Sequence, residues 1–223
     1  MKLNAIIVSL IVFAIGGCTK IDNTYKSAKA PEINFRGNAY EYLRSQTGVY
    51  DSLLKAISRI QGLEDTLKTG DITLFAANNR SFELAFLNIN QARMDSVPQM
   101  PLADINSVDV DVLDSVLCKY MIRGKIKSSD LYSSLSDGID VETIKYGYSM
   151  NMKLLFTNAN GYVAGGPKLI NFSDRNRSIF TRYWITTQTS TIDISADNAV
   201  INLLTSGHDF GFGSTFIRAV NKR

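Results

Sequence analysis

The sequence predicts an α+β fold in which several short helices pack on a twisted β-sheet or sandwich core. Helical periodicity dominates residues 38–121, and β-rich runs separated by turn residues dominate residues 128–204. Apolar residues make up 45% of the 223 residues, which supplies enough material for one large core. The same composition excludes a disordered or low-complexity protein.

The N-terminus has the pattern of a lipoprotein signal peptide over residues 1–17. Lys2 precedes an apolar run, residues 5–15, which is shorter than the ~20 apolar residues that a membrane-spanning helix needs. The sequence Ile15-Gly16-Gly17-Cys18 resembles a bacterial lipobox, in which the Cys sulfur is diacylated and becomes the new N-terminus. We therefore predict lipidation by palmitate-type chains at Cys18. The alternative is an ordinary secretory signal in which the Cys is incidental.

A polar stretch with almost no periodicity follows, and we expect residues 18–34 to be the lipidated Cys and a flexible tether. The folded domain is then expected over residues 35–223. The chain has two cysteines, and an acylated Cys18 leaves no partner for a disulfide. Cys118 lies in an apolar pattern, so we expect a small buried hydrophobe rather than a reactive thiol.

The first half of the domain predicts helices and one strand. Residues 38–67 have helical apolar spacing that is broken near Thr47-Gly48 and again near Gly62, so two or three short helices fit. Asp71–Ala77 is a β-rich run, and the pair Asn78-Asn79 after it is expected to turn the chain and cap the next helix.

A further helix is predicted from apolar residues at i, i+1, i+4, i+5, i+8 and i+9, which are Val112, Leu113, Val116, Leu117, Tyr120 and Met121. Asp109 and Asp111 lie in its first turn, where carboxylates complement the helix dipole. A calcium loop is the other interpretation of these carboxylates, but the loop Gly is absent and Tyr120 occupies the twelfth position.

The second half predicts strands separated by turns. The expected strands are Val141–Ile144, Lys153–Thr157, Lys168–Phe172, Ile179–Thr187, Thr191–Ser195 and Val200–Leu204. A Gly-rich loop over residues 206–214 follows, from which Phe210 and Phe212 are expected to fold back onto the core. Thr215–Val220 is expected to form a short terminal strand.

The order of these elements and four segments resemble a fasciclin-like domain over about residues 38–204. The matching segments are Tyr40–Ile57, Ile72–Phe82, Leu113–Leu131 and Asn198–Leu204. The resemblance implies structural roles for Phe75, Asn79, Phe82, Tyr120, Gly124 and Asn198. With the lipobox, it indicates a fasciclin-like domain lipoprotein of a Gram-negative bacterium.

The sequence departs from the family pattern at several positions. Ala77 and Asn78 stand where Pro and Thr are usual, and Met121 replaces the His of the family's Tyr-His pair. Asn202 stands where the closing strand often has a His. We expect Met121 to replace that His in the core from an apolar helix face.

A cluster of cationic and aromatic residues marks the candidate binding surface. Its members are Arg175, Arg177, Arg182, Tyr183 and Trp184, which are residue types that dominate binding hot spots and sugar stacking. The alternative is that Tyr183 and Trp184 only pack on opposite faces of a strand, with the arginines at a hairpin tip.

Composition limits the chemistry. The net charge is +3 with scattered basic residues, so we expect no nucleic-acid partner. One His and two Cys nearly exclude a zinc site built from several such ligands, and we expect no metal or cofactor. His208-Asp209 has the look of half a catalytic triad, but the chain has no Gly-x-Ser-x-Gly nucleophile motif to complete it.

The resemblance implies a lipid-anchored adhesion or interaction module that is not an enzyme. Its expected partners are the membrane, through the N-terminal anchor, and a protein or glycan at the cell surface. The expected location is the outer membrane of the cell envelope, facing the periplasm or the exterior. Two alternatives stay open: a glycan-binding accessory lipoprotein of an outer-membrane nutrient-uptake system, and a hydrolase that uses His208.

Overall fold

The computed structural model describes residues 32–222 except residues 97–99, 135 and 160–162. The predicted signal peptide, the lipidation site Cys18 and nearly all of the predicted tether lie outside these residues. No helix within the described residues is long and apolar enough to cross a membrane.

Three short helices open the domain, as predicted. They are α2 (Ala39–Ser45), α3 (Asp51–Ser58) and α4 (Leu63–Thr69). Asn38 begins α2 with a reciprocal capping box, in which its side chain and that of Glu41 each accept a backbone N–H of the other. Gly62 has a φ of 77°, a left-handed conformation that favours glycine, and it separates α3 from α4.

The predicted first strand and the helix after it are confirmed. Strand β1 (Ile72–Ala76) is buried along its whole length, and α5 (Asn79–Ser96) begins at the second residue of the Asn pair. The Asn79 side chain accepts a hydrogen bond from the backbone N–H of Ser52 at 2.8 Å and donates one to the Gly48 carbonyl at 3.0 Å. It therefore ties the start of α5 to the start of α3.

The next apolar run changes from helix to strand along its length. A short 3₁₀ turn, η1 (Ile105–Ser107), precedes α6 (Val110–Leu117), which passes through the 3₁₀ turn η2 (Cys118–Tyr120) into strand β2 (Met121–Arg123). The prediction that Met121 lies on a helix face is therefore wrong. Met121 is buried in β2 instead, because its main chain pairs with Leu74 of β1.

The remaining strands follow the 3₁₀ segment η3 (Ser128–Ser134). They are β3 (Ile139–Glu142), β4 (Ser149–Phe156), β5 (Lys168–Asp174), β6 (Ile185–Ser195) and β7 (Ala199–Leu204). The predicted strand Ile179–Thr187 is wrong over its first two thirds, where a loop contains the 3₁₀ turn η4 (Thr181–Tyr183) and β6 begins only at Ile185. The two strands predicted over residues 179–195 are one strand, β6, with β-bulges near Thr191.

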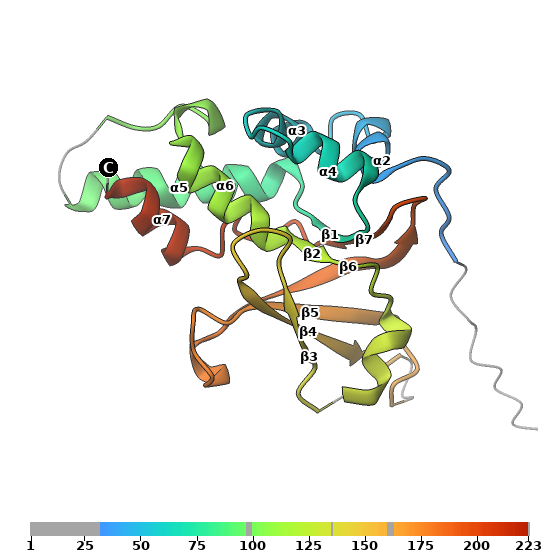
Figure 1. Cartoon of the computed structure of the whole chain (residues 1–223). Helices are drawn as coiled ribbons and strands as arrows, with labels where there is room; N and C mark the ends of the chain where they lie inside the picture. The colour runs from blue at the N-terminus through green and yellow to red at the C-terminus, as the bar shows by residue number, and fades with distance from the viewer. Residues whose placement is uncertain (1–31, 97–99, 135, 160–162, 223) are drawn as a thin grey trace, which may run out of the picture. The chain divides into compact units, whose positions relative to one another are not determined.

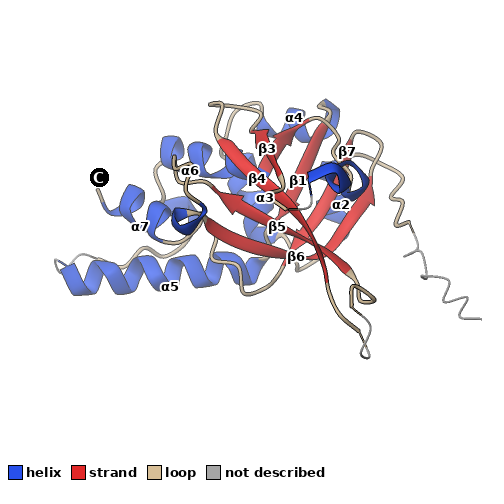
Figure 2. Cartoon of the chain, turned by 90° about the horizontal axis from the view of Figure 1, so that it is seen from below, coloured by secondary structure: helices blue, strands red, loops and turns tan. Residues whose placement is uncertain are grey.

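The described strands form one mixed sheet in the order β2-β1-β7-β6-β5-β4-β3 (Figure 2). Only β1 and β7 run parallel, and the other neighbours are antiparallel. A β-bridge between Ile122 and Thr143 joins the two end strands, so the sheet is nearly closed on itself. The rings of Phe75 in β1 and Phe172 in β5 stack 3.7 Å apart across its interior.

The C-terminal segment forms helix α7 (Ser214–Asn221), so the predicted strand Thr215–Val220 is wrong. Phe216 is fully buried, and α7 packs against α5 (Figure 1). The apolar residues Phe216, Ile217 and Val220 fall at i, i+1 and i+4, which places them on one face of a helix. Burial of that face outweighs the strand preference of the β-branched residues.

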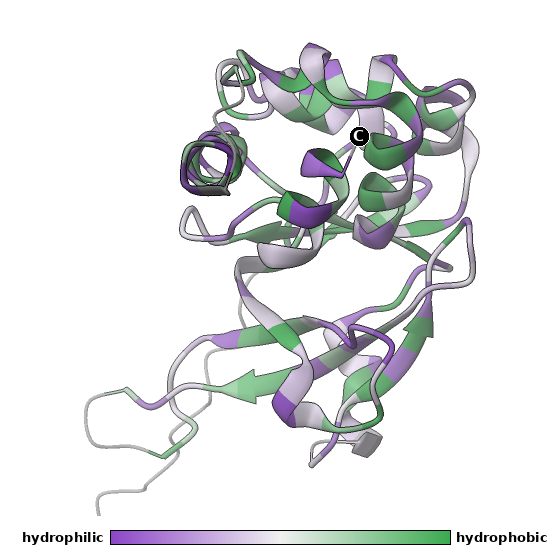
Figure 3. Cartoon of the chain, turned by 90° about the vertical axis from the view of Figure 1, so that its left-hand side faces the viewer, coloured by the Kyte–Doolittle hydropathy of each residue, from purple (hydrophilic) through white to green (hydrophobic). Residues whose placement is uncertain are grey.

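The helices gather on one side of the domain, above β1 and β7, and strands β3 to β5 lie on the side away from them (Figure 1). Both the helices and the strands carry hydrophobic and hydrophilic residues side by side (Figure 3). Helices packed on a mixed sheet confirm the predicted α+β class. Phe210 and Phe212 are buried, which confirms that the Gly-rich loop folds back onto the core.

Candidate functional site

The candidate binding residues lie on the loop between β5 and β6, residues 175–184, which we call the β5–β6 loop. Its first part is a tight turn, in which the backbone N–H of Ser178 donates to the Arg175 carbonyl at 2.8 Å. Asn176 and Arg177 occupy its centre with φ values of 48° and 57°. Asn tolerates this left-handed conformation, but Arg rarely adopts it, and such strain is often found at functional sites.

Arg175 and Trp184 brace this loop internally. The Arg175 guanidinium lies 5.3 Å from the ring centroid of Trp184, forms an ion pair with Asp140 and donates to Ser149 Oγ at 3.0 Å. The indole N–H of Trp184 donates to the Ser178 carbonyl at 2.8 Å. The start of the loop is therefore held to β3 and β4, and the Trp184 end is held to the start.

The middle of the loop presents apolar and aromatic surface. Ile179, Phe180 and Tyr183 are 75%, 57% and 51% exposed. The guanidinium of Arg182 lies 5.4 Å from the ring centroid of Phe180 and 4.7 Å from that of Tyr183. Tyr183 and Trp184 precede β6 in this structure, so the interpretation that they pack on opposite faces of a strand is wrong.

A cleft of about 650 Å³ opens beside the β5–β6 loop. Its walls come from the loop, the β3–β4 turn, η2 and the start of α7. The lining residues are Lys119, Tyr146, Gly147, Tyr148, Ser149, Asp174, Arg175, Asn176, Arg177, Ser178, Ile179 and Thr215. Arg175 and Arg177 of the predicted cluster line this cleft, whereas Arg182, Tyr183 and Trp184 are not among its lining residues.

A buried ion pair lies at the wall of the cleft. Nζ of Lys119 lies 2.5 Å from Oδ2 of Asp174, and both side chains are only 8% exposed. Nζ also lies 5.6 Å from the Tyr148 ring centroid and 5.9 Å from that of Phe212. The pair joins η2 to the end of β5, directly before the β5–β6 loop.

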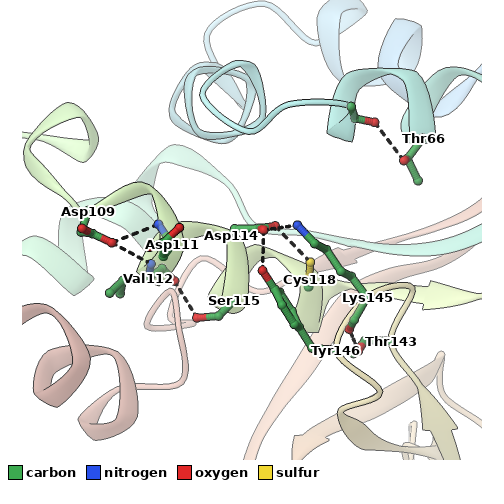
Figure 4. Close-up of polar contacts among 11 residues, drawn as sticks. Thr66, Asp109, Asp111, Val112, Asp114, Ser115, Cys118, Thr143, Lys145 and Tyr146 are labelled. Carbon is green, nitrogen blue, oxygen red and sulfur yellow. Dashed lines mark hydrogen bonds and ion pairs between the residues drawn. The ribbon is translucent and has the colours of Figure 1, made fainter.

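Asp114 of α6 fixes the β3–β4 turn through contacts with Lys145 and Tyr146 (Figure 4). Its carboxylate accepts hydrogen bonds from the Tyr146 hydroxyl at 2.6 Å and the Cys118 thiol at 3.4 Å, and it forms an ion pair with Lys145. Burial alone would raise the pKa of Asp114, but the hydrogen bonds from Lys145, Tyr146 and Cys118 outweigh burial and lower it. The carboxylate therefore stays charged and holds Tyr146 at the cleft.

Asp109 and Asp111 lie at the start of α6, as the sequence predicts. Asp109 Oδ1 accepts the backbone N–H groups of Asp111 at 3.0 Å and Val112 at 3.2 Å, which caps α6. The described residues contain no group of three or more His, Cys, Asp and Glu side chains arranged to hold a metal ion.

Cys118 is fully buried, as predicted. Burial, reinforced by the neighbouring Asp114 carboxylate, raises the pKa of its thiol to about 12. The thiol is therefore protonated at neutral pH and is a weak nucleophile.

His208 belongs to a buried hydrogen-bonded chain. The backbone N–H of Gly211 donates to the Tyr120 hydroxyl oxygen at 2.7 Å, and the Tyr120 hydroxyl shares a hydrogen bond with Nε2 of His208 at 2.6 Å. Burial lowers the pKa of His208 to about 4, so the imidazole is neutral at pH 7. The Tyr120–His208 bond ties the Gly-rich loop to η2. The Asp209 carboxylate accepts a hydrogen bond from the Asn88 side chain at 2.7 Å and so lends no support to a triad.

The residues singled out by the family resemblance lie in the core or at junctions of the fold. Phe75 stacks on Phe172, Phe82 stacks on Phe210 with ring centroids 4.1 Å apart, and Asn79 links α5 to α3. Gly124, with a φ of 83°, accepts a hydrogen bond from the Thr73 hydroxyl at 2.7 Å. Tyr120 lies in the His208 chain, and Asn198 bonds to three backbone groups of the helical layer.

Sequence reasoning missed Lys119, Asp174, Tyr146 and Tyr148 as parts of the site. The available signal was a lysine within an apolar run, between Cys118 and Tyr120. A buried lysine needs a partner, but the partner lies 55 residues away and no local pattern indicates it.

No family model matches the chain, and no curated protein matches it either. Among solved structures, the chain is similar to a FAS1 domain pair from the insect cell adhesion molecule Fasciclin I, with a TM-score of 0.49 and 13% sequence identity. The similarity covers 78% of this chain and 50% of that one, so the chain spans about half of the two-domain structure.

Proposed function

We propose that the chain is a non-catalytic interaction module of the fasciclin-like type, anchored by a lipid on Cys18 in a bacterial cell envelope. The observation that carries the interaction role is the β5–β6 loop, where Ile179, Phe180 and Tyr183 are all more than half exposed. Large apolar side chains clustered on a braced loop are typical of binding surfaces. Arg182 adds a cation to the same surface.

The bracing matters for affinity. Arg175 and Trp184 hold the loop in one conformation, so a partner does not bear the full entropic cost of ordering it. Many copies on one membrane would add avidity to a modest single contact. This favours a partner on another surface, a protein or a glycan of the cell envelope or of the surroundings.

The lipid anchor is supported by the leader and lipobox in residues 1–18. It is tested by mass spectrometry of the N-terminal peptide and by palmitate labelling of cells that make the chain. We expect labelling in the wild-type chain and none in Cys18→Ser. An unmodified N-terminus or a labelled Cys18→Ser chain would contradict the anchor.

The interaction role is tested with lipid vesicles that carry the full chain, added to arrays of matrix proteins and envelope components. We expect binding that the double substitution Phe180→Ser, Arg182→Ala removes. Leu87→Ser is the matched control, because Leu87 is 65% exposed on α5, away from the loop. Equal loss in the control, or no binding by the wild-type chain, would argue against a loop-mediated contact.

For the glycan-binding alternative, the residues expected to contact the sugar differ from those that the sequence predicts. Trp184 is only partly exposed, and its indole N–H and one region of its ring are occupied within the loop, so it makes a poor free stacking platform. Tyr146 also has a cation over its ring, Nζ of Lys145 at 5.0 Å from the centroid, but Tyr146 is 54% exposed and lines the cleft. A saccharide contact is therefore better sought in the cleft than at Trp184.

A further inference from the structure

We propose that the cleft beside the β5–β6 loop binds an acidic saccharide, whose carboxylate or sulfate group is held by Arg177. The cleft volume of about 650 Å³ lies within the ~300–1,000 Å³ that is usual for small-molecule sites. This is a second site on the interaction module, and it does not depend on the loop binding a partner.

The charges of the cleft favour an anion. Three lining residues are cationic, Lys119, Arg175 and Arg177, and one, Asp174, is acidic. Lys119 neutralises Asp174, and Arg175 is paired with Asp140, which does not line the cleft. Within the described part of the chain, Arg177 makes no ion pair, side-chain hydrogen bond or ring contact. Its guanidinium is therefore available for a bidentate bond to a carboxylate or sulfate.

The backbone keeps Arg177 at this position. It occupies the second left-handed residue of the turn that the Ser178–Arg175 hydrogen bond closes. Asp174 Oδ1 accepts the backbone N–H of Asn176 at 2.8 Å, and so links the turn to the residue that also binds Lys119. The ion pair and the turn together place the free cation at the cleft.

The start of α7 adds to the positive potential. Thr215, in the first turn of α7, lines the cleft, and Gly213 at the N-cap offers no side chain to the free N–H groups of that turn. The Thr215 hydroxyl oxygen is buried and has no hydrogen-bond partner among the described residues. The backbone N–H groups at the helix end are further groups that a bound anion can satisfy.

The other lining groups favour a sugar ring over a bare inorganic anion. Tyr146 and Tyr148 lie on one wall with ring centroids 6.1 Å apart, and Tyr146 is fixed by Asp114. Aromatic faces of this kind pack against the C–H face of a sugar. Hydroxyl and amide groups of Ser149, Asn176 and Ser178 line the same cleft, whereas Ile179 is its one aliphatic lining residue.

The test is a calorimetric titration of the full chain, purified in detergent, with methyl glucuronide, methyl galacturonide, N-acetylneuraminate and glucose 6-sulfate. Methyl glucoside and sodium sulfate are the neutral and inorganic comparisons. We expect at least one acidic sugar to bind, with the neutral sugar at least tenfold weaker and sulfate weaker than the best acidic sugar. Failure of all four acidic sugars, or equal binding of the neutral sugar or of sulfate, would overturn the proposal.

Variants separate this site from a general charge effect. Arg177→Ala is expected to weaken binding about tenfold or more, because a charge-assisted hydrogen bond is lost. Tyr146→Ala is expected to weaken it as well, and Tyr146→Phe is expected to weaken it less, because the stacking face is kept and only the hydroxyl bond to Asp114 is lost. Arg80→Ala on α5 is the control, because its side chain is 59% exposed and pairs only with Glu83. Unchanged affinity in Arg177→Ala would overturn the assignment.

Discussion

The ammonium group of Lys119 and the carboxylate of Asp174 lie 2.5 Å apart, with both side chains 8% exposed. Breaking such a pair leaves one charge buried without a partner, so Lys119→Met is expected to lower the free energy of unfolding by about 3–5 kcal/mol. Urea unfolding followed by circular dichroism measures this change.

The double substitution Lys119→Met, Asp174→Asn is the matched control for that pair. It removes both charges, so we expect it to recover most of the stability lost in Lys119→Met. A double variant as unstable as the single one would mean that packing of the lysine stem, and not the unpaired carboxylate, accounts for the loss.

Trp184 is the chain's one tryptophan, and its fluorescence therefore reports directly on the β5–β6 loop. We expect Arg175→Ala to shift its emission to longer wavelength and to increase quenching by acrylamide, because the guanidinium no longer covers the ring. Arg182→Ala, which contacts Phe180 and Tyr183 instead, is expected to leave the Trp184 emission unchanged. Identical spectra for Arg175→Ala and the wild-type chain would show that Arg175 does not brace the loop.

His208 makes stability depend on pH. Its pKa is about 4 in the folded chain, below the ordinary value of 6.5, so the unfolded chain binds more protons between these pH values. This stability is fully present above pH 6.5, and about 3 kcal/mol of it is lost as the pH falls to 4. Urea midpoints measured between pH 4 and pH 7 test this.

His208→Gln is the control for the pH profile, because the Gln amide can form a hydrogen bond with the Tyr120 hydroxyl but does not titrate. Burial raises the pKa of Asp209, which opposes the effect at the acidic end of the range. The difference between wild type and His208→Gln cancels that contribution. Parallel pH profiles in the two chains would contradict a buried neutral His208.

The regular elements of this fold are largely predictable because their apolar residues repeat at helical or strand spacing. The failures at Ile179–Trp184 and Thr215–Val220 have a common cause. Both segments are rich in aromatic and β-branched residues, which favour strands locally. In the first segment Arg175 and Ser178 hold Trp184 in a loop, and in the second the burial of Phe216 selects a helix.

The site was predictable only in part. Arg175 and Arg177 are recognisable as binding residue types, and both line the cleft. Asp114 and Tyr146, however, are 32 residues apart and meet only because the β3–β4 turn folds over α6. Contacts at this separation leave no periodic signal in a single sequence, so the wall of the cleft could not be derived from it.

Cys118 offers a test of both its burial and the lipid anchor. With a pKa of about 12 and no exposure, its thiol is expected not to react with Ellman's reagent at pH 8 in the native chain. In guanidinium chloride, the chain purified from membranes is expected to show one thiol that reacts with Ellman's reagent, because an acylated Cys18 is blocked. Two thiols after denaturation would contradict lipidation, and one thiol in the native state would contradict the burial of Cys118.

Asn198 holds the helical layer to the sheet through three hydrogen bonds. Its Oδ1 accepts the backbone N–H of Ala39 at 3.0 Å, and its Nδ2 donates to the carbonyls of Leu67 at 3.0 Å and Gly70 at 2.9 Å. Asn198→Ala leaves these backbone groups without the side-chain partner, so we expect a loss of about 2–3 kcal/mol in the free energy of unfolding.

Asn198→Asp sharpens the same test. The carboxylate still accepts from Ala39 but cannot donate to the two carbonyls, so it is expected to be at least as unstable as Asn198→Ala. Gln61→Ala, at an exposed turn, is expected to change stability by less than about 0.5 kcal/mol. If Asn198→Ala unfolds at the wild-type urea concentration, apolar packing of Ala39 and Leu67 holds this junction, and the hydrogen bonds of Asn198 serve only to satisfy its own half-buried amide.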